Sequence, residues 1–187
     1  MKKKKEKIIG VDEAGRGPLA GPVFAGAAYI KEEPEFLKEI KDSKKISEKK
    51  RERLYDQIIR SEKIVTSVAY MNSDVIDSIN ILEATKLAMK EAVEGIKEKG
   101  LVVVDGNFKI PIERKQKSVI KADEKILECS IASIIAKVSR DRVMRKMDNE
   151  FPGYGFSSNK GYPTKAHKEA IKKLGPTRIH RKSFEMN

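Results

Sequence analysis

The sequence has few of the residues that build disulfide frameworks or histidine-rich metal sites. Its 187 residues include one cysteine, Cys129, and two histidines, His167 and His180. A single cysteine excludes an internal disulfide and a cysteine-based zinc finger, and two histidines disfavour a histidine-rich metal site. We expect Cys129 in the core and the histidines at the surface or in packing contacts.

Long hydrophobic runs are also missing. The longest stretch without a charged residue, residues 17–30, has 14 residues and two prolines, and it is too short to span a bilayer. No signal peptide is visible, because Asp12 and Glu13 interrupt the first apolar stretch. We therefore expect a cytoplasmic protein with no membrane contact.

Positive charge is abundant by contrast. The 40 Lys and Arg residues outnumber the 28 Asp and Glu residues, so the net charge is +12. Most of the excess lies at the two ends, with +4 in residues 1–7 and +6 in residues 157–187. The C-terminal stretch mixes basic residues with aromatic residues and glycines, a combination that suits contact with phosphates and stacked bases. The charge pattern predicts a nucleic acid as the partner.

The hydrophobic pattern predicts a mixed sheet covered by helices. Runs of apolar and alternating residues predict five strands, at residues 7–12, 23–30, 64–70, 101–104 and 118–120. Capping residues and helical spacing predict helices from Ser47 to residue 60, from 81 to Gly100, from 123 to 147 and from 164 to 174. Strands interleaved with helices are typical of the α/β class.

Acidic residues follow three of the predicted strands. Asp12 and Glu13 follow the first strand, Asp105 the fourth, and Asp123 the fifth. Ligands of open α/β sheets gather beyond the carboxyl ends of the strands, so we expect these carboxylates to meet there. Adjacent carboxylates repel one another unless cations lie between them, and hard oxygen ligands favour Mg²⁺ or Mn²⁺. An acidic metal centre within a basic surface suits phosphodiester hydrolysis.

Each acid also has a simpler explanation on its own. Asp123 can be the N-cap of the longest helix, Asp105 can belong to an ordinary turn, and Asp12 with Glu13 can be a solvated strand end. In a regular strand, Asp12 and Glu13 point to opposite faces. Both reach one site only if the chain leaves strand geometry, which the glycines that follow make easy.

Six blocks of the sequence, in order, resemble those of type 2 ribonuclease H (ribonuclease HII). They are residues 12–22 (DEAGRGPLAGP), 42–45 (DSKK), 104–106 (VDG), 131–141 (IASIIAKVSRD), 154–164 (YGFSSNKGYPT) and 180–184 (HRKSF). The resemblance implies an RNase H-like fold, with a mixed five-stranded sheet flanked by helices and a small C-terminal helical extension. It implies one catalytic domain over residues 1–187, with a basic tail at 1–6 and an extension from about 148 to 187 that contacts substrate.

The resemblance also implies an activity. It indicates an endoribonuclease that hydrolyses the RNA strand of RNA–DNA hybrids and nicks duplex DNA on the 5′ side of an embedded ribonucleotide. The products carry 3′-hydroxyl and 5′-phosphate ends, and the mechanism uses two metal ions. A monomer is implied, and a contact with a replication clamp is left open.

Residue roles follow position by position from the resemblance. The metal-binding and catalytic acids would be Asp12, Glu13, Asp105 and Asp123, which hold Mg²⁺ or Mn²⁺, two ions when substrate is bound. The substrate-binding residues would be Gly15, Arg16, Gly17, Lys44, Lys45 and Tyr162. The Gly-Arg-Gly segment matches the part that recognises the ribose 2′-hydroxyl, largely through backbone groups. The tyrosine matches the residue that contacts the next deoxyribose, and the two lysines lie near the phosphate backbone.

Two positions bear on the alternatives. Ala122 stands where the family usually has glycine, which affects how Asp123 is aimed. Arg16 favours type 2 over type 3 ribonuclease H, which usually has Gly-Lys-Gly there. The sequence leaves open another nuclease of the same superfold, such as a type 3 ribonuclease H or a resolvase-like enzyme, and a non-catalytic basic nucleic-acid-binding module. We expect Arg140 and Asp141 to form a structural pair within the longest helix.

Overall fold

A mixed five-stranded sheet forms the centre of the computed structural model, which describes residues 6–41 and 47–185. The strands are β1 (Ile8–Ala14), β2 (Val23–Ile30), β3 (Ile64–Met71), β4 (Leu101–Asp105) and β5 (Gln116–Val119). Their order is β3-β2-β1-β4-β5. The pairs β1–β2 and β2–β3 are antiparallel, whereas β1–β4 and β4–β5 are parallel. The predicted α/β class and the mixed five-stranded sheet are therefore confirmed.

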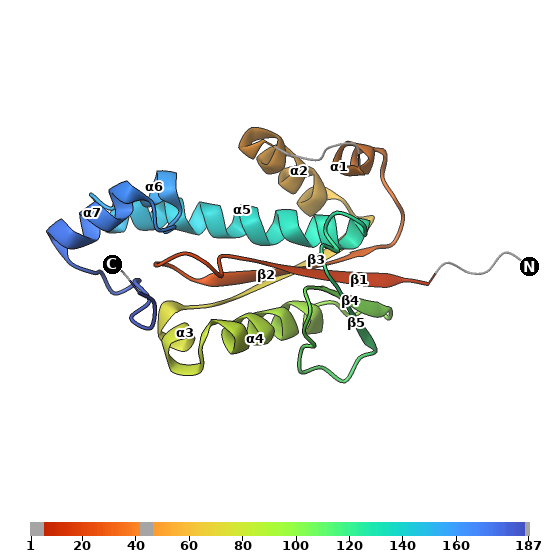
Figure 1. Cartoon of the computed structure of the whole chain (residues 1–187). Helices are drawn as coiled ribbons and strands as arrows, with labels where there is room; N and C mark the ends of the chain where they lie inside the picture. Colours follow the sequence, from red (N-terminus) through yellow and green to blue (C-terminus); the bar gives the residue numbers. More distant parts are fainter. Residues whose placement is uncertain (1–5, 42–46, 186–187) are drawn as a thin grey trace, which may run out of the picture.

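Helices cover both faces of this sheet (Figure 1). One face carries the long α5 (Leu127–Glu150), together with α1 (Lys38–Lys41) and α2 (Glu48–Arg60); the other carries α3 (Ser73–Ile79) and α4 (Ile81–Glu94). The remaining short elements are the 3₁₀ helix η1 (Glu35–Leu37), α6 (Phe156–Asn159) and α7 (Lys165–Leu174). The last two lie at the C-terminal end of α5 and form the helical extension. Each face of the sheet has its own apolar core, one against α4 and one against α5 and α2.

Two predicted helix starts are confirmed, and each has a side-chain cap, of which that of Ser47 was predicted. The side chain of Ser47 accepts a hydrogen bond from the N–H of Lys50 at 3.3 Å, and that of Thr164 accepts one from His167 at 3.2 Å. Each cap satisfies a donor that the first helical turn leaves without a partner.

Two predicted helix limits are wrong. The helix predicted to run from 81 to Gly100 is α4, which ends at Glu94. Gly100 instead lies against the backbone of Lys7, where a Cβ would come within 2.8 Å of the carbonyl oxygen. The long helix α5 runs from Leu127 to Glu150 rather than from 123 to 147, so Asp123 lies in the preceding turn and is not its N-cap.

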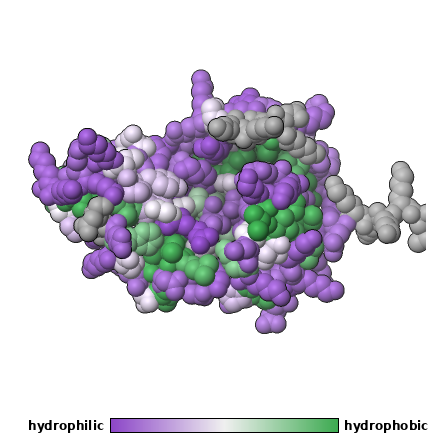
Figure 2. Space-filling view, in the orientation of Figure 1, coloured by the Kyte–Doolittle hydropathy of each residue, from purple (hydrophilic) through white to green (hydrophobic). Residues whose placement is uncertain are grey.

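Hydrophilic residues cover much of the visible surface. Figure 2 shows hydrophilic residues over most of one face, in keeping with the 36% of charged residues. Within residues 6–41 and 47–185, no helix is both long enough and apolar enough to cross a membrane.

Two glycines let α5 lie directly on the backbone of the sheet. A Cβ added to Gly10 of β1 would come within 2.3 Å of the backbone of Glu128 and Cys129. A Cβ added to Gly26 of β2 would come within 2.3 Å of the carbonyl oxygen of Ala132. The first turns of α5 are therefore fixed against the two central strands.

Replacing Gly26 with alanine tests this contact. We expect Gly26→Ala to lower the free energy of unfolding by about 2 kcal/mol, because the helix backbone must move to admit the methyl group. Gly17→Ala is the matched control: its Cβ would lie 3.8 Å from Cε1 of Tyr162, an ordinary van der Waals contact, so we expect a change within about 0.5 kcal/mol. Urea unfolding measures both, and equal effects would contradict the packing argument.

Candidate active site

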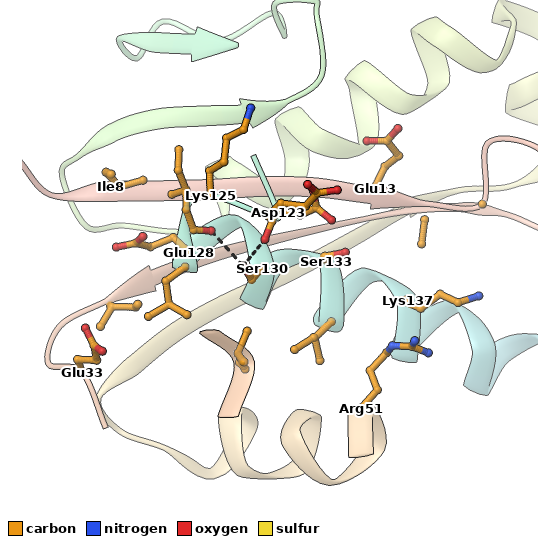
Figure 3. Close-up of a pocket in the computed structure, with 18 of the residues that line it drawn as sticks. Ile8, Glu13, Glu33, Arg51, Asp123, Lys125, Glu128, Ser130, Ser133 and Lys137 are labelled. Carbon is orange, nitrogen blue, oxygen red and sulfur yellow. Dashed lines mark hydrogen bonds between the residues drawn. The ribbon is translucent and has the colours of Figure 1, made fainter. Parts of the chain in front are cut away.

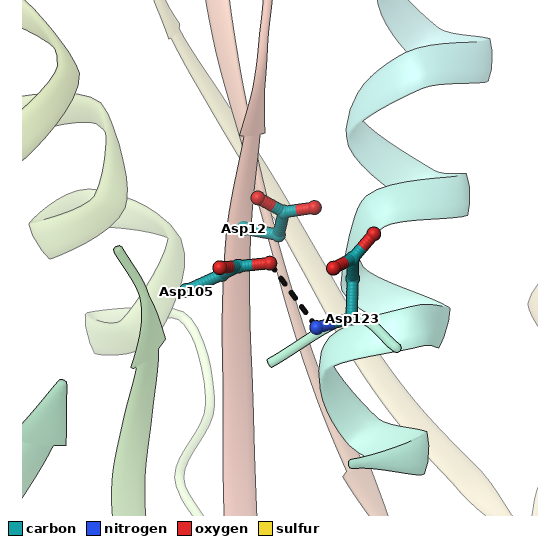
Figure 4. Close-up of side chains that lie close together, drawn as sticks. All are labelled: Asp12, Asp105 and Asp123. Carbon is teal, nitrogen blue, oxygen red and sulfur yellow. Dashed lines mark hydrogen bonds between the residues drawn. The ribbon is translucent and has the colours of Figure 1, made fainter. Parts of the chain in front are cut away.

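Three of the four predicted metal-binding acids lie together (Figure 4). Asp12 is on β1, Asp105 ends the neighbouring β4, and Asp123 lies in the turn between β5 and α5. Each offers a carboxylate oxygen, and these atoms lie within 4.8 Å of one another. The parallel pairing accounts for two of them, because Val11 opposes Val104 and the residues that follow lie side by side.

A tight turn brings the third carboxylate to the other two. Lys121 has a φ of 55°, and the N–H of Asp123 donates to Oδ2 of Asp105 at 3.1 Å. Ala122 does not have a positive φ, and it is buried in one apolar cluster with Cys129. Alanine therefore fits this position without backbone strain. Cys129 lies in the core, as predicted.

Glu13 is close to the three aspartates but is not one of the group. The strand β1 continues to Ala14, so Asp12 and Glu13 start from opposite faces of the strand, but their carboxyl groups remain within side-chain hydrogen-bonding range of each other. Figure 3 shows it apart from Asp123. Its carboxylate lies 3.4 Å from Nη1 of Arg16.

Burial and mutual repulsion make negative charge costly here. Burial raises the pKa of Asp12 well above its ordinary value, and the charges of Glu13 and Asp105 raise it further. A hydrogen bond from Ser133 acts in the opposite direction. Burial and the contact with Asp105 also raise the pKa of Asp123. A cation among these carboxylates would remove the repulsion.

The donor set of Asp12, Asp105 and Asp123 is compatible with a divalent metal ion. All three donors are hard carboxylate oxygens, the type that Mg²⁺ and Mn²⁺ prefer. Two oxygens on opposite sides of one Mg²⁺ are about 4.2 Å apart. The observed spread of 4.8 Å is close to this value and requires only small side-chain adjustments.

An open cleft of about 1490 Å³, lined by Asp123 and Glu13, extends along α5 (Figure 3). Asp123 lines it, as do Ser130, Ser133 and Lys137, which follow one another at helical spacing on the cleft side of α5. The Ser130 hydroxyl donates to the carbonyl oxygen of Asp123. The sequence reasoning did not single out these three residues. Their polar stripe in the mostly apolar first half of α5 is the signal that marks them.

The Gly15–Gly17 turn and Tyr162 line the same cleft. A Cβ on Gly17 would lie 3.8 Å from Cε1 of Tyr162, whose side chain is 40% exposed. Arg16 is exposed, and its guanidinium lies 5.7 Å from the ring centroid of Phe108. The structure thus brings together four of the predicted substrate-binding residues.

The other two predicted substrate-binding residues, Lys44 and Lys45, lie outside the described residues.

Two buried histidines support the backbone of Tyr162. The N–H of Thr177 donates to Nδ1 of His180 at 2.8 Å, so the proton of His180 is on Nε2. Nε2 of His180 lies 3.1 Å from Nε2 of His167, which must accept; His167 then donates from Nδ1 to the carbonyl oxygen of Tyr162 at 2.9 Å. Both histidines are neutral and buried. Of the two expected locations, surface or packing contacts, the structure therefore shows packing contacts.

Known proteins are similar to this chain in sequence and in architecture. The family model for Ribonuclease HII matches residues 9–187. The chain is 51% identical over 182 residues to Ribonuclease HII of Caldicellulosiruptor bescii, covering 96% of this chain and 87% of that protein. Its structure is similar to that in the PCNA:RNase HII complex of Archaeoglobus fulgidus, with a TM-score of 0.82, 26% identity and coverage of 97% and 96%. It is also similar to ribonuclease H2 of Pyrococcus horikoshii, with a TM-score of 0.77, 31% identity and coverage of 96% and 94%.

The sheet order, the flanking helices and the acidic group place the protein in the RNase H-like class of α/β proteins. Within that class, the chain belongs to the ribonuclease HII family. The resemblance found in the sequence is confirmed, and the family is that of metal-dependent ribonuclease H enzymes. The membership favours type 2 over type 3 and gives no support to a non-catalytic binding module.

The histidine pair predicts a loss of stability in acid. Burial lowers the pKa of both side chains, that of His180 to about 4 from an ordinary value of 6.5. Between these values the unfolded chain binds more protons than the folded one, so the free energy of unfolding falls as the pH falls from about 6.5 to about 4. For His180 the loss is about 3 kcal/mol.

Urea unfolding of the wild type and of His180→Gln across this pH range measures the effect. The raised pKa values of the buried carboxylates act in the opposite direction, so the difference between the two proteins is the informative quantity. Equal acid sensitivity of wild type and variant would show that His180 is not responsible.

Proposed function

We propose that this protein is an endoribonuclease that hydrolyses the RNA strand of RNA–DNA hybrids and nicks duplex DNA on the 5′ side of a single embedded ribonucleotide. The products would carry 3′-hydroxyl and 5′-phosphate ends. The observation that carries the proposal is the group of three carboxylates, Asp12, Asp105 and Asp123, of which Asp123 also lines a cleft together with the Gly15–Gly17 turn and Tyr162. Membership of the ribonuclease HII family supports it.

Asp12, Asp105 and Asp123 would hold the metal, with Glu13 as an additional acid beside them. We propose Mg²⁺ or Mn²⁺, with two ions when substrate is bound. Such ions supply Lewis-acid chemistry, lowering the pKa of the attacking water and stabilising the leaving 3′-oxygen. Asp12 is buried and lies on the central strand β1, so it is our candidate for the residue nearest both ions.

Selection of a ribonucleotide would fall to the Gly15–Gly17 turn. Gly17 presents no side chain to the cleft, so a sugar can approach its backbone closely. The 2′-hydroxyl distinguishes RNA from DNA, and a site whose polar groups are committed to a hydroxyl strongly rejects an analogue without it. Tyr162 beside Gly17 would contact the deoxyribose that follows.

Basic side chains near the acids would bind the phosphate backbone. Lys137 lines the cleft, with Nζ held 2.9 Å from Oδ1 of Asp141, and Arg16 lies at the turn itself. Lys44 and Lys45 remain proposed contacts with the backbone. We further propose a cytoplasmic monomer with one catalytic domain, in which residues from about 148 onward contact substrate.

Removing one carboxylate tests the metal assignment. We expect Asp12→Asn to lower the rate of nicking by about a hundredfold or more with Mg²⁺, because a central ligand is lost, while binding to hybrid persists. The substrate is a DNA duplex with one ribonucleotide, and the nick is mapped to the nucleotide. The control is Asp74→Asn, which changes an exposed acid in the first turn of α3. Near-normal nicking by Asp12→Asn would overturn the assignment.

Tyr162→Ala tests the substrate-contact role of the tyrosine. We expect kcat/KM on the single-ribonucleotide duplex to fall by about tenfold, because a contact beside the junction is lost. The free energy of unfolding should change by less than about 1 kcal/mol, since the side chain is 40% exposed. Tyr70→Ala is the control, because Tyr70 is also exposed but lies on the edge strand β3. A stability loss that matches the loss of activity would instead indicate a packing role.

A further inference from the structure

Two arginines lie fully buried behind the Gly15–Gly17 turn. Arg140, on α5, and Arg181, near the C-terminus, are both 0% exposed. In the part of the chain that the structure describes, neither forms an ion pair with a carboxylate; Asp141, the expected partner of Arg140, pairs with Lys137 instead. Buried charge without a countercharge is costly, so these side chains need another explanation.

Arg181 donates hydrogen bonds to three backbone carbonyl groups, two of which belong to the turn. Its Nη2 donates to the carbonyl oxygen of Gly15 at 2.6 Å, and its Nη1 donates to that of Arg16 at 2.9 Å. Its Nε donates to the carbonyl oxygen of Gly21 at 3.0 Å. A planar guanidinium can serve three carbonyl groups at once, whereas a lysine ammonium is a point donor.

Arg140 ties the same loop to the segment that carries Tyr162. It donates from Nε to the carbonyl oxygen of Pro22 at 2.9 Å and from Nη2 to that of Ala20 at 3.2 Å. Its Nη1 donates to the carbonyl oxygen of Lys160 at 2.9 Å, and its guanidinium lies 5.8 Å from the ring centroid of Tyr162. The loop after β1 and the segment before α7 are therefore fixed relative to each other.

The contacts of Arg181 also set the direction of two N–H groups. In a planar trans peptide, the C=O and the N–H point in opposite directions. The C=O of Gly15 shares its peptide with the N–H of Arg16, and the C=O of Arg16 shares its peptide with the N–H of Gly17. Both N–H groups therefore point away from Arg181, on a turn that lines the cleft. Among the backbone hydrogen bonds of the described residues, neither is a donor.

We propose that Arg181, supported by Arg140, is a positioning residue that aims the N–H groups of Arg16 and Gly17 at the sugar of the ribonucleotide. The inference rests on the proposed function and deepens it, because it assigns ribonucleotide selection to a side chain that does not touch substrate. The peptide groups on the cleft side bind, and the guanidinium behind them fixes their direction before the substrate arrives.

Binding to two matched duplexes tests the proposal. All proteins carry Asp12→Asn to prevent cleavage, and the duplexes differ only in one ribonucleotide against the corresponding deoxyribonucleotide. We expect Arg181→Lys to reduce the preference for the ribonucleotide duplex by about tenfold, roughly the effect of one hydrogen bond. Affinity for the all-DNA duplex should stay unchanged, because the positive charge is kept. The control is Arg178→Lys, at an exposed arginine that pairs with Glu150 in the same segment.

Amide signals provide a second measurement that needs no arginine variant. In the Asp12→Asn protein, we expect the amides of Arg16 and Gly17 to exchange rapidly with solvent, since they have no hydrogen-bond acceptor among the described residues. Their NMR signals should shift on addition of the ribonucleotide duplex and much less on addition of the all-DNA duplex. This measurement decides the matter if Arg181→Lys does not fold.

Failure of the positioning role of Arg181 and failure of the proposed function give different results. If Arg181→Lys folds and keeps its preference within about twofold of the parent, or loses affinity for both duplexes equally, the positioning role is overturned. Protected amides, or equal shifts with both duplexes, also overturn it. If the parent itself has no preference and the wild-type protein does not nick the ribonucleotide duplex, the proposed function fails instead.

Discussion

The close contact between α5 and the sheet determines where the polar groups of the cleft lie. Because Gly10 and Gly26 have no side chains, the helix backbone rests directly on β1 and β2. This contact brings Ser133 within hydrogen-bonding range of Asp12 and places Ser130 under the turn that carries Asp123. The same packing thus contributes to the stability of the core and to the geometry of the acidic group. A shift of the helix would alter both.

Electrostatics impose a second constraint, since a basic protein has to bind a polyanion next to its own acids. The net charge of +12 attracts phosphate, while the aspartates at the centre repel it and one another. Arg140 and Arg181 place positive charge behind the Gly15–Gly17 turn but bond to carbonyl groups, so they leave the carboxylates available for metal ions. Arg16 is different, because it pairs directly with Glu13 at the mouth of the site.

Local patterns predicted much of the fold and of the acidic group. The strand at residues 23–30 was predicted with its observed limits, because its apolar run ends at a charged residue. The meeting of Asp12 and Asp105 follows from two strands that run parallel and end together. The position of Asp123 depends on a turn of a few residues, including the positive φ of Lys121, and such turns have no clear pattern in the sequence. Burial of Arg140 was not predictable, because its carbonyl partners are far away along the chain.

The arrangement separates the groups proposed for chemistry from those proposed for selection. Asp12 and Asp105 come from two central strands, and Asp123 comes from the turn before α5, so their geometry follows from the core. The Gly15–Gly17 turn depends in addition on Arg181, which reaches it from the opposite end of the chain. The turn therefore takes its final form only when the C-terminal segment has docked. Under the proposed function, choice of the sugar would depend on the completed tertiary structure, whereas the acidic group needs the sheet, α5 and the turn between them.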